Sequence, residues 1–121
     1  MTPSVVFAPQ AARDIVSALD WSEDHFGQEA RTRYAGLIAA AIEAVAADTT
    51  RAGVKLASPA DPRLRLYHLR NVRSQHSPDA IRRPRHFIVF RVRDDGLDIV
   101  RVLHEAMDLQ RHLSVEGDDS A

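Results

Sequence analysis

The residues best suited to chemistry gather near the C-terminal end of the chain. His104, Asp108 and His112 follow one another at intervals of four residues. On one continuous helix, side chains at this spacing share a face, and three such ligands could bind zinc. The run HEAMD lacks the second histidine of the HExxH motif, however, and we expect His104 to end a strand. The sequence therefore predicts no metal site, and we expect no other cofactor.

His104 itself has two interpretations. At the end of a strand its ring can simply hydrogen-bond a carbonyl or Asp108, and this structural interpretation is favoured. The functional alternative is that His104 contacts a target macromolecule or acts as a general acid. Arg101 and Arg111 lie on either side of it in the sequence and could supply cations to the same surface.

Positive charge is also concentrated in the middle of the chain. Seven arginines and a single acid, Asp79, lie between Arg63 and Arg85. Such a surplus could bind nucleic acid or an acidic partner. The chain has only one lysine, Lys55, so arginine is its ordinary cation. Solvated surface arginines are therefore the favoured interpretation, and the stretch alone assigns no partner.

Length and composition indicate one globular domain. The chain has 121 residues, enough for one hydrophobic core. We expect a single domain over residues 1–113 and a disordered, polar tail at 114–121. No apolar run approaches the length that spans a bilayer. The absence of cysteine excludes disulfides, thiolate zinc sites and cysteine nucleophiles. We expect a cytoplasmic protein that does not contact membranes.

Two helices are predicted in the first half of the chain. Ser4–Phe7 has the composition of a short strand, and Pro9 suits the first turn of a helix that runs to His25 or Phe26. After Gly27, apolar side chains recur at helical spacing over about five turns, which predicts a second helix. Small residues beside this stripe favour an antiparallel helical hairpin. The stripe consists of Ala30, Tyr34, Leu37, Ile38, Ala41, Ile42 and Val45.

Strands are predicted in the second half. Leu64–Leu69 alternates in polarity and lies between a loop at Arg51–Arg63 and a long basic loop at Arg70–Pro84. Phe87 begins a hairpin whose return strand ends near Leu103.

The turn of that hairpin is predicted at Asp94-Asp95-Gly96, because aspartate and glycine tolerate the positive φ of tight turns. Two registers remain open, with Phe90 opposite either Arg101 or Val100. The order of elements is β-α-α-β-β-β. We therefore expect a two-layer α+β domain in which an N-terminal helical hairpin packs on an antiparallel sheet.

With this order of elements, the chain resembles the ParE toxins of the RelE/ParE superfamily, the toxin halves of bacterial type II toxin–antitoxin pairs. The resemblance covers about Val5 to Leu113. The opening VVFAPQAARDI is similar to the family's strand-to-helix entry. The most specific part is the run HFIVFRV, an acidic turn and then LDIVRVLHEAMDLQRHL, which resembles the family's closing hairpin and tail. Its characteristic residues are Arg101, Leu103, His104, Asp108 and Leu113.

The resemblance implies a small toxin that inhibits DNA gyrase by binding and is neutralised by a cognate antitoxin, ParD-like or of another family. A heterotetramer or a larger assembly with the antitoxin is one expectation. The antitoxin is expected to cover an apolar strip on the helical hairpin or an open strand edge. Tyr34 also suits core packing. The expected target-binding residues are Arg101, His104, Asp108 and Arg111, and the expected antitoxin-binding residues are Tyr34, Leu37, Ile38 and Arg85.

RelE-type relatives imply an alternative function, cleavage of messenger RNA on the ribosome. That reaction needs a general base for the ribose 2′-hydroxyl and cations around the phosphate. The sequence has no tyrosine after Tyr67 and no recognisable catalytic arrangement. Binding of gyrase is therefore favoured over catalysis, and a non-toxic antitoxin-binding domain is a third possibility. The catalytic candidates are His104, Arg101 and Arg111, with His68, Arg70, Arg73 and His86 as further residues near the sheet.

Overall fold

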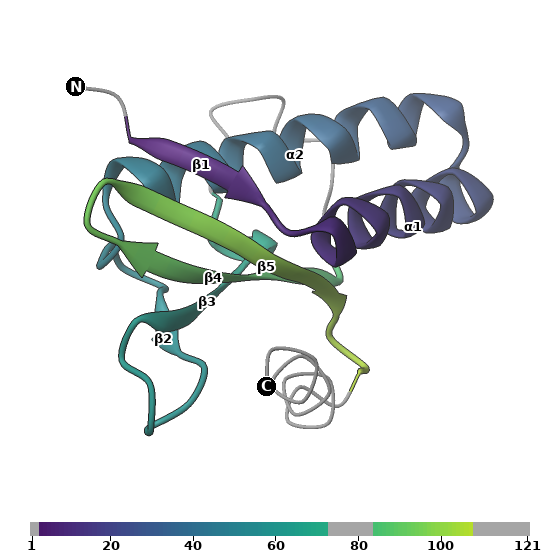
Figure 1. Ribbon diagram of the computed structural model, residues 1–121. Coiled ribbons are helices and arrows are strands. Elements are labelled where there is room, and N and C mark those ends of the chain that lie inside the picture. Colours follow the sequence, from purple (N-terminus) through teal and green to yellow (C-terminus); the bar gives the residue numbers. More distant parts are fainter. Residues whose placement is uncertain (1–2, 73–83, 108–121) are drawn as a thin grey trace.

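A computed structural model of the chain describes residues 3–72 and 84–107. Two helices cover one face of a five-stranded sheet, which gives the two-layer α+β fold that the sequence predicts (Figure 1). The elements are β1 (Ser4–Phe7), α1 (Pro9–Phe26), α2 (Gln28–Ala47), β2 (Lys55–Leu56), β3 (Leu64–His68), the short 3₁₀ helix η1 (Leu69–Asn71), β4 (His86–Arg93) and β5 (Gly96–His104). Neither helix is long and apolar enough to cross a membrane.

The strand order across the sheet is β1-β5-β4-β3-β2. The strands β3, β4 and β5 pair antiparallel, as predicted. Two features differ from the prediction. The two-residue strand β2 lies inside the segment expected to be a loop and pairs antiparallel with β3. The first strand, β1, pairs parallel with β5, so the sheet is mixed rather than antiparallel throughout.

Gly96 makes the parallel pairing possible. A Cβ atom at Gly96 would collide with the backbone carbonyl oxygen of Ser4. Only glycine therefore lets β1 approach the start of β5 at this point. The expected reason for the glycine was wrong, because Gly96 does not have a positive φ. Asp94 and Asp95 form the two-residue turn, also without positive φ, and Arg93 lies opposite Gly96.

Both predicted hairpin registers are wrong. Phe90 lies opposite Ile99, whereas its neighbour Val89 lies opposite Arg101. Val100 is therefore the extra residue of a β-bulge, which a pattern of alternating polarity does not reveal. The bulge reverses the alternation of β5, so that Ile99 and Val102 both belong to the core beneath the helices.

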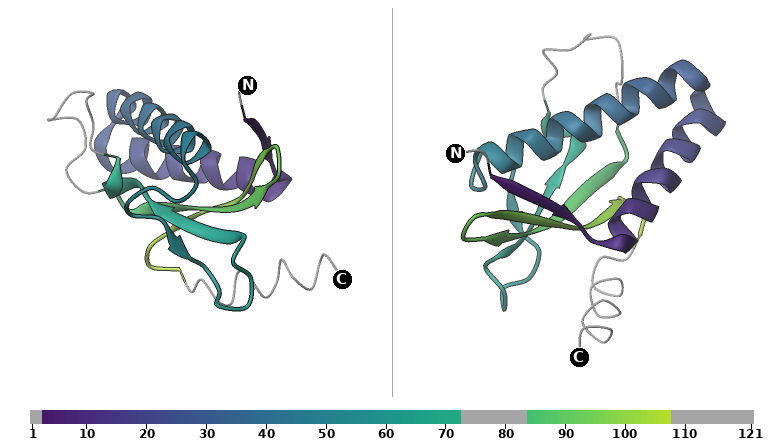
Figure 2. Two further views of the ribbon diagram at one scale, coloured as in Figure 1. Left: turned by 90° about the vertical axis from the view of Figure 1, so that its left-hand side faces the viewer. Right: turned by 45° about the horizontal axis from the view of Figure 1, so that its top comes forward.

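The two helices are joined at a single glycine. The N–H of Gly27 bonds to the carbonyl of Glu23 at 2.8 Å, and its φ of +94° changes the chain direction before α2 begins. The helices diverge from this turn, as the right-hand view of Figure 2 shows. Near the turn, Arg31 of α2 pairs with Asp20 of α1 at 2.7 Å.

Apolar side chains fill both faces of the sheet. The inward stripe of α2 packs on the helix-covered face together with β4 and β5 residues such as Ile88, Phe90 and Leu97. A second, smaller cluster lies on the opposite face and consists of Ala57, Leu64, Phe87, Val89 and Leu103. Burial on both faces explains why His86–Phe90 in β4 is buried without interruption.

Candidate functional site

The predicted target-binding residue Arg101 is held inside the fold. Its Nε and Nη2 donate to the two carboxylate oxygens of Asp14 at 2.7 and 3.1 Å. The backbone N–H of Val102 donates to the same carboxylate at 3.0 Å. Both side chains are nearly buried, with exposed fractions of 9% for Arg101 and 10% for Asp14. This pair ties α1 to β5, so the guanidinium of Arg101 is not presented to a partner.

A cluster of rings fills the space between the helical turn and the ends of β4 and β5. The hydroxyl of Tyr34 lies 2.6 Å from Nδ1 of His86 and accepts the backbone N–H of Arg85 at 3.0 Å. The ring of His86 also contacts those of Trp21 and His104, with centroid distances of 5.3 and 5.1 Å. This arrangement connects α1, α2, β4 and β5 at one point.

Two members of the ring cluster, His86 and Tyr34, are uncharged at neutral pH. Burial, followed by the neighbouring His104 and His68, lowers the pKa of His86 to about 4. Burial raises the pKa of Tyr34 to about 12. The short contact between the Tyr34 hydroxyl and Nδ1 of His86 is therefore a hydrogen bond between two neutral groups.

His104 ends β5, as predicted. Its Nδ1 accepts the backbone N–H of Ala106 at 3.0 Å, rather than bonding a carbonyl. Its ring lies 5.7 Å from that of Trp21. These contacts fit the structural interpretation of His104, since they fix the chain direction where the strand ends.

Glu105 organises a second polar network, although no local sequence pattern marks it as a functional residue. Its carboxylate accepts from Nε2 of His68 at 2.9 Å and from Nη1 of Arg85 at 2.8 Å. Its backbone N–H continues the ladder of β5 by bonding the Arg85 carbonyl at 2.7 Å. Hydrogen bonds from Arg85 and then His68 lower the pKa of Glu105 to about 2. A carboxylate with this pKa stays ionised and is a poor general base.

Three histidines of the described residues, His68, His86 and His104, also have hydrogen-bond partners. Nδ1 of His68 accepts the backbone N–H of Arg70 at 3.0 Å, while Nε2 faces Glu105. Nδ1 of His86 is bonded to the Tyr34 hydroxyl, and Nδ1 of His104 accepts the backbone N–H of Ala106. Residues 3–72 and 84–107 contain no group of three histidine, aspartate or glutamate side chains that could hold a metal ion.

A shallow cleft of about 240 Å³ opens beside the Glu105 network. Leu66, Phe87 and Met107 supply its apolar lining. Phe87 belongs to the apolar cluster on the face of the sheet that the helices leave uncovered, and Leu66 packs against that cluster. Polar side chains around the cleft include Lys55, His68, Arg70 and Glu105.

The outer edge of β1 is apolar and open. The N–H of Ser4 donates to the carbonyl of Asp95, just before β5, at 2.9 Å, and that of Ala8 donates to the carbonyl of Ile99 in β5 at 3.0 Å. Because donors alternate along a parallel ladder, the N–H groups of Val5 and Phe7 point away from β5. No strand of the described part of the chain lies beyond β1. The side chains of Val6 and Phe7 remain 50% and 45% exposed, so this edge could accept a further strand.

The predicted antitoxin-binding residues of α2 face inward. Tyr34, Leu37 and Ile38 are buried in the core beneath the helices, where the chain's own sheet covers them. The same stripe that predicts the helix also predicts its buried face, so its apolar character does not mark a free surface. Arg85 is half-buried and bonded to Glu105.

Several predicted functional residues lie outside the described residues. These are Asp108, Arg111, His112 and Leu113 of the tail, together with Arg73 of the basic loop.

Comparison with known proteins gives matches to a family and to solved structures. The family described as the ParE toxin of the type II toxin–antitoxin system parDE matches residues 5–109. No protein with a curated description matches significantly.

Two solved structures share the fold. The chromosomal ParDE toxin–antitoxin system from P. aeruginosa aligns with a TM-score of 0.60 at 17% identity, covering 85% of this chain and 96% of the other. The E. coli DinJ-YafQ toxin–antitoxin complex aligns with a TM-score of 0.50 at 12% identity, covering 88% and 96%.

Proposed function

The chain belongs to the ParE toxin family of type II toxin–antitoxin systems, and we propose that it inhibits DNA gyrase by binding and is neutralised by a cognate antitoxin. The family match over residues 5–109 is the observation that carries this proposal. It includes β5 and His104, the part of the chain in which the sequence resembles the family most specifically.

The hydrogen bonding of the histidines favours binding over catalysis. A ribonuclease of the RelE type needs a base that can accept the proton of a ribose 2′-hydroxyl. Both ring nitrogens of His68 already have partners, and Nδ1 of His86 and of His104 is occupied. Glu105, with a pKa of about 2, is too weak a base to replace them. Messenger RNA cleavage is therefore the less favoured function.

The open edge of β1 is the best candidate for antitoxin binding. The two surfaces expected for antitoxin binding are an apolar strip on the helical hairpin and a free sheet edge. The strip formed by Tyr34, Leu37 and Ile38 is buried, whereas β1 exposes both backbone groups and apolar side chains. An extended antitoxin segment could extend the sheet there through main-chain hydrogen bonds. The complex could be a heterotetramer. Its stoichiometry depends on how the antitoxin itself assembles as well as on this chain.

Controlled induction of the gene in bacteria tests the proposal. Inhibition of gyrase predicts filamentous cells and a DNA damage response, both prevented by co-expression of the antitoxin encoded beside the toxin gene. Rapid arrest of protein synthesis with cleaved messages would instead indicate an endonuclease. Unchanged growth would indicate a non-toxic, antitoxin-binding domain.

A further inference from the structure

The cleft beside Glu105 combines apolar lining with unpaired positive charge. Leu66, Phe87 and Met107 line it, and Met107 is 45% exposed. Lys55 and Arg70 are exposed at the same cleft. Neither side chain has an ion-pair partner among the residues that the structure describes.

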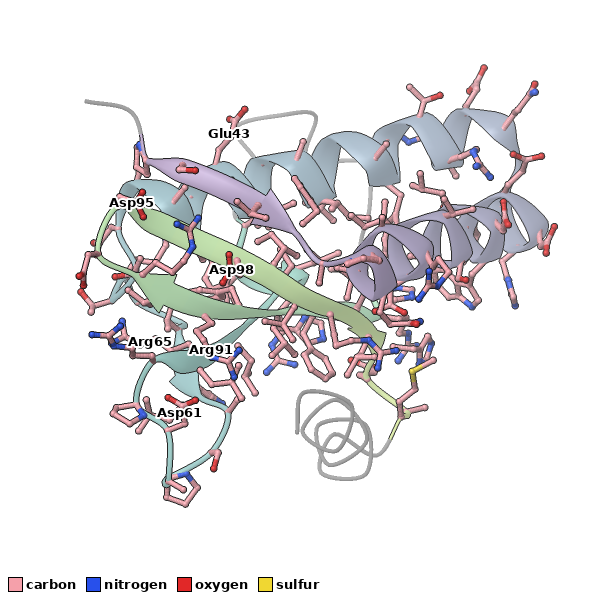
Figure 3. The ribbon with its side chains drawn as sticks, viewed as in Figure 1. Glu43, Asp61, Arg65, Arg91, Asp95 and Asp98 are labelled. Carbon is pink, nitrogen blue, oxygen red and sulfur yellow. The ribbon has the colours of Figure 1, made fainter. Side chains whose placement is uncertain are left out.

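This lack of partners sets Lys55 and Arg70 apart from other cations nearby. On β4, Arg91 pairs with Asp61 at 3.5 Å (Figure 3). Arg85 pairs with Glu105 at 2.8 Å. Because Arg85 already neutralises Glu105, the carboxylate of the cleft, the remaining charge of the cleft is positive. An anionic group on a partner would therefore find two available cations.

The walls of the cleft are held by local contacts. Gly53 has a φ of +99°, and a Cβ atom there would lie 2.7 Å from Cγ of Asn71. This close approach brings the segment before β2 against η1, so that residues on either side of the cleft are fixed relative to one another. Across the cleft, the bond from His68 to Glu105 connects the end of β3 to the end of β5.

The chemistry of the cleft fits a peptide better than a nucleic acid. Single-stranded nucleic acid binds where cations follow a backbone and exposed aromatic rings stack on bases. Among the described residues that line the cleft, the one phenyl ring, that of Phe87, is 8% exposed, and the His68 ring is bonded to Glu105. A carboxylate side chain next to a leucine-like side chain would match the two cations and the apolar lining together.

We propose that this cleft binds an acidic segment of the antitoxin that also carries an apolar side chain. This inference rests on the proposed function, since it assigns a second contact to the same partner. The cleft lies toward β2 and β3, whereas the open edge of β1 is at the other side of the sheet. One antitoxin chain that reached both sites would hold the toxin bivalently, which raises its affinity without a new type of contact.

The test measures the affinity of the full-length chain for the antitoxin encoded beside its gene. The test variant is Lys55→Glu with Arg70→Glu, which reverses both cleft charges. The matched control is Arg13→Glu with Arg33→Glu, which makes the same change in net charge at two exposed helix positions. We expect the cleft variant to bind at least tenfold more weakly in low salt and the control to change less than twofold. The difference between wild type and cleft variant should shrink as salt is raised.

A synthetic peptide provides a second readout. An Asp-Glu-Leu-Asp-Glu-Leu peptide should bind the wild-type chain, whereas Asn-Gln-Leu-Asn-Gln-Leu should not. The acidic peptide should also lose binding in the cleft variant. Unchanged antitoxin affinity of the cleft variant would overturn the inference, as would stronger competition by a single-stranded hexanucleotide than by the acidic peptide.

These failures are distinguishable from failure of the proposed function. Inhibition of gyrase by the free toxin does not depend on the antitoxin, so it is measured separately on the wild type. If gyrase is inhibited and antitoxin affinity is unaffected by the cleft charges, only the cleft assignment is wrong.

Discussion

At the scale of single residues, buried polar groups act in pairs that lie far apart in the sequence. The Asp14 carboxylate accepts hydrogen bonds from the Arg101 guanidinium and the Val102 N–H, and so joins α1 to β5. His86 and Tyr34 do the same for β4 and α2. These contacts bury the side chains best suited to chemistry inside the fold. Recognition of a partner is therefore left to surface residues.

Loss of Asp14 should therefore destabilise the protein strongly. In Asp14→Ala the guanidinium of Arg101 would stay nearly buried without its carboxylate, and such losses cost about 3–5 kcal/mol. Urea unfolding monitored by circular dichroism measures the change. Asp20→Ala is the control, because its pair with Arg31 is exposed and worth less than about 1 kcal/mol. Equal effects of the two substitutions would contradict the structural role of Asp14.

The buried ring of His86 makes stability depend on pH. Its pKa is about 4 in the folded state and near 6.5 in the unfolded state, so the unfolded chain binds the proton more tightly. The free energy of unfolding should therefore fall by about 3 kcal/mol as pH decreases from above 6.5 to 4. In His86→Asn this loss should be much smaller, whereas the exposed His25→Asn control should keep it. Urea unfolding at pH 7, 5.5 and 4 measures the difference, and identical pH profiles for all three proteins would refute it.

At the scale of elements, the parallel pairing of β1 with β5 depends on one close backbone approach. Gly96 lies against Ser4, and the bulge at Val100 follows within the same strand. Together they allow β5, a central strand, to pair in parallel on one side and antiparallel on the other.

The substitution Gly96→Ala should loosen β1. The added methyl group would meet Ser4 backbone, which cannot move aside as a flexible side chain could, and overpacking of this kind costs about 1–3 kcal/mol. Hydrogen exchange at the N–H of Ser4 should become faster. Gly36→Ala is the matched control: nothing lies within 4 Å of its Cβ, so it should stabilise α2 by about 0.5–1 kcal/mol. Unchanged exchange in the Gly96 variant would argue against the tight β1–β5 contact.

The open edge of β1 gives a direct test of sheet extension by the antitoxin. Phe7→Pro removes an N–H group that points away from β5, so the existing ladder stays intact. Phe7→Ala is the control, because it removes the same side chain but keeps the N–H. Calorimetric titration should show the proline variant binding the antitoxin about tenfold more weakly than the alanine variant, because the proline variant forms one main-chain hydrogen bond fewer. Equal affinities would mean that the antitoxin does not pair with this edge.

At the scale of the whole molecule, the fold was largely predictable from the sequence and the surface was not. The helical stripe containing Leu37 and Ile38 predicts both the second helix and its buried face. The helical spacing of the apolar residues indicates the helix, and their position indicates the side that packs on the sheet. The parallel pairing of β1 and the bulge at Val100 were missed, since neither has a local pattern.

The candidate site was predictable only in part. Arg101 appeared available for binding because its partner, Asp14, lies 87 positions away in the sequence. Glu105 was overlooked, since its partners Arg85 and His68 meet it only when the strands are paired. The location of the cleft likewise depends on residues from β2, β3 and the end of β5, which only the folded chain brings together.

The most direct test of the account is a supercoiling assay with purified components. Relaxed plasmid, DNA gyrase and ATP are incubated with the toxin, alone or with an excess of the antitoxin. We predict that supercoiling is inhibited by the toxin alone and restored by the antitoxin, while messenger RNA translated on ribosomes stays intact. Full gyrase activity together with cleaved message would contradict the proposed function.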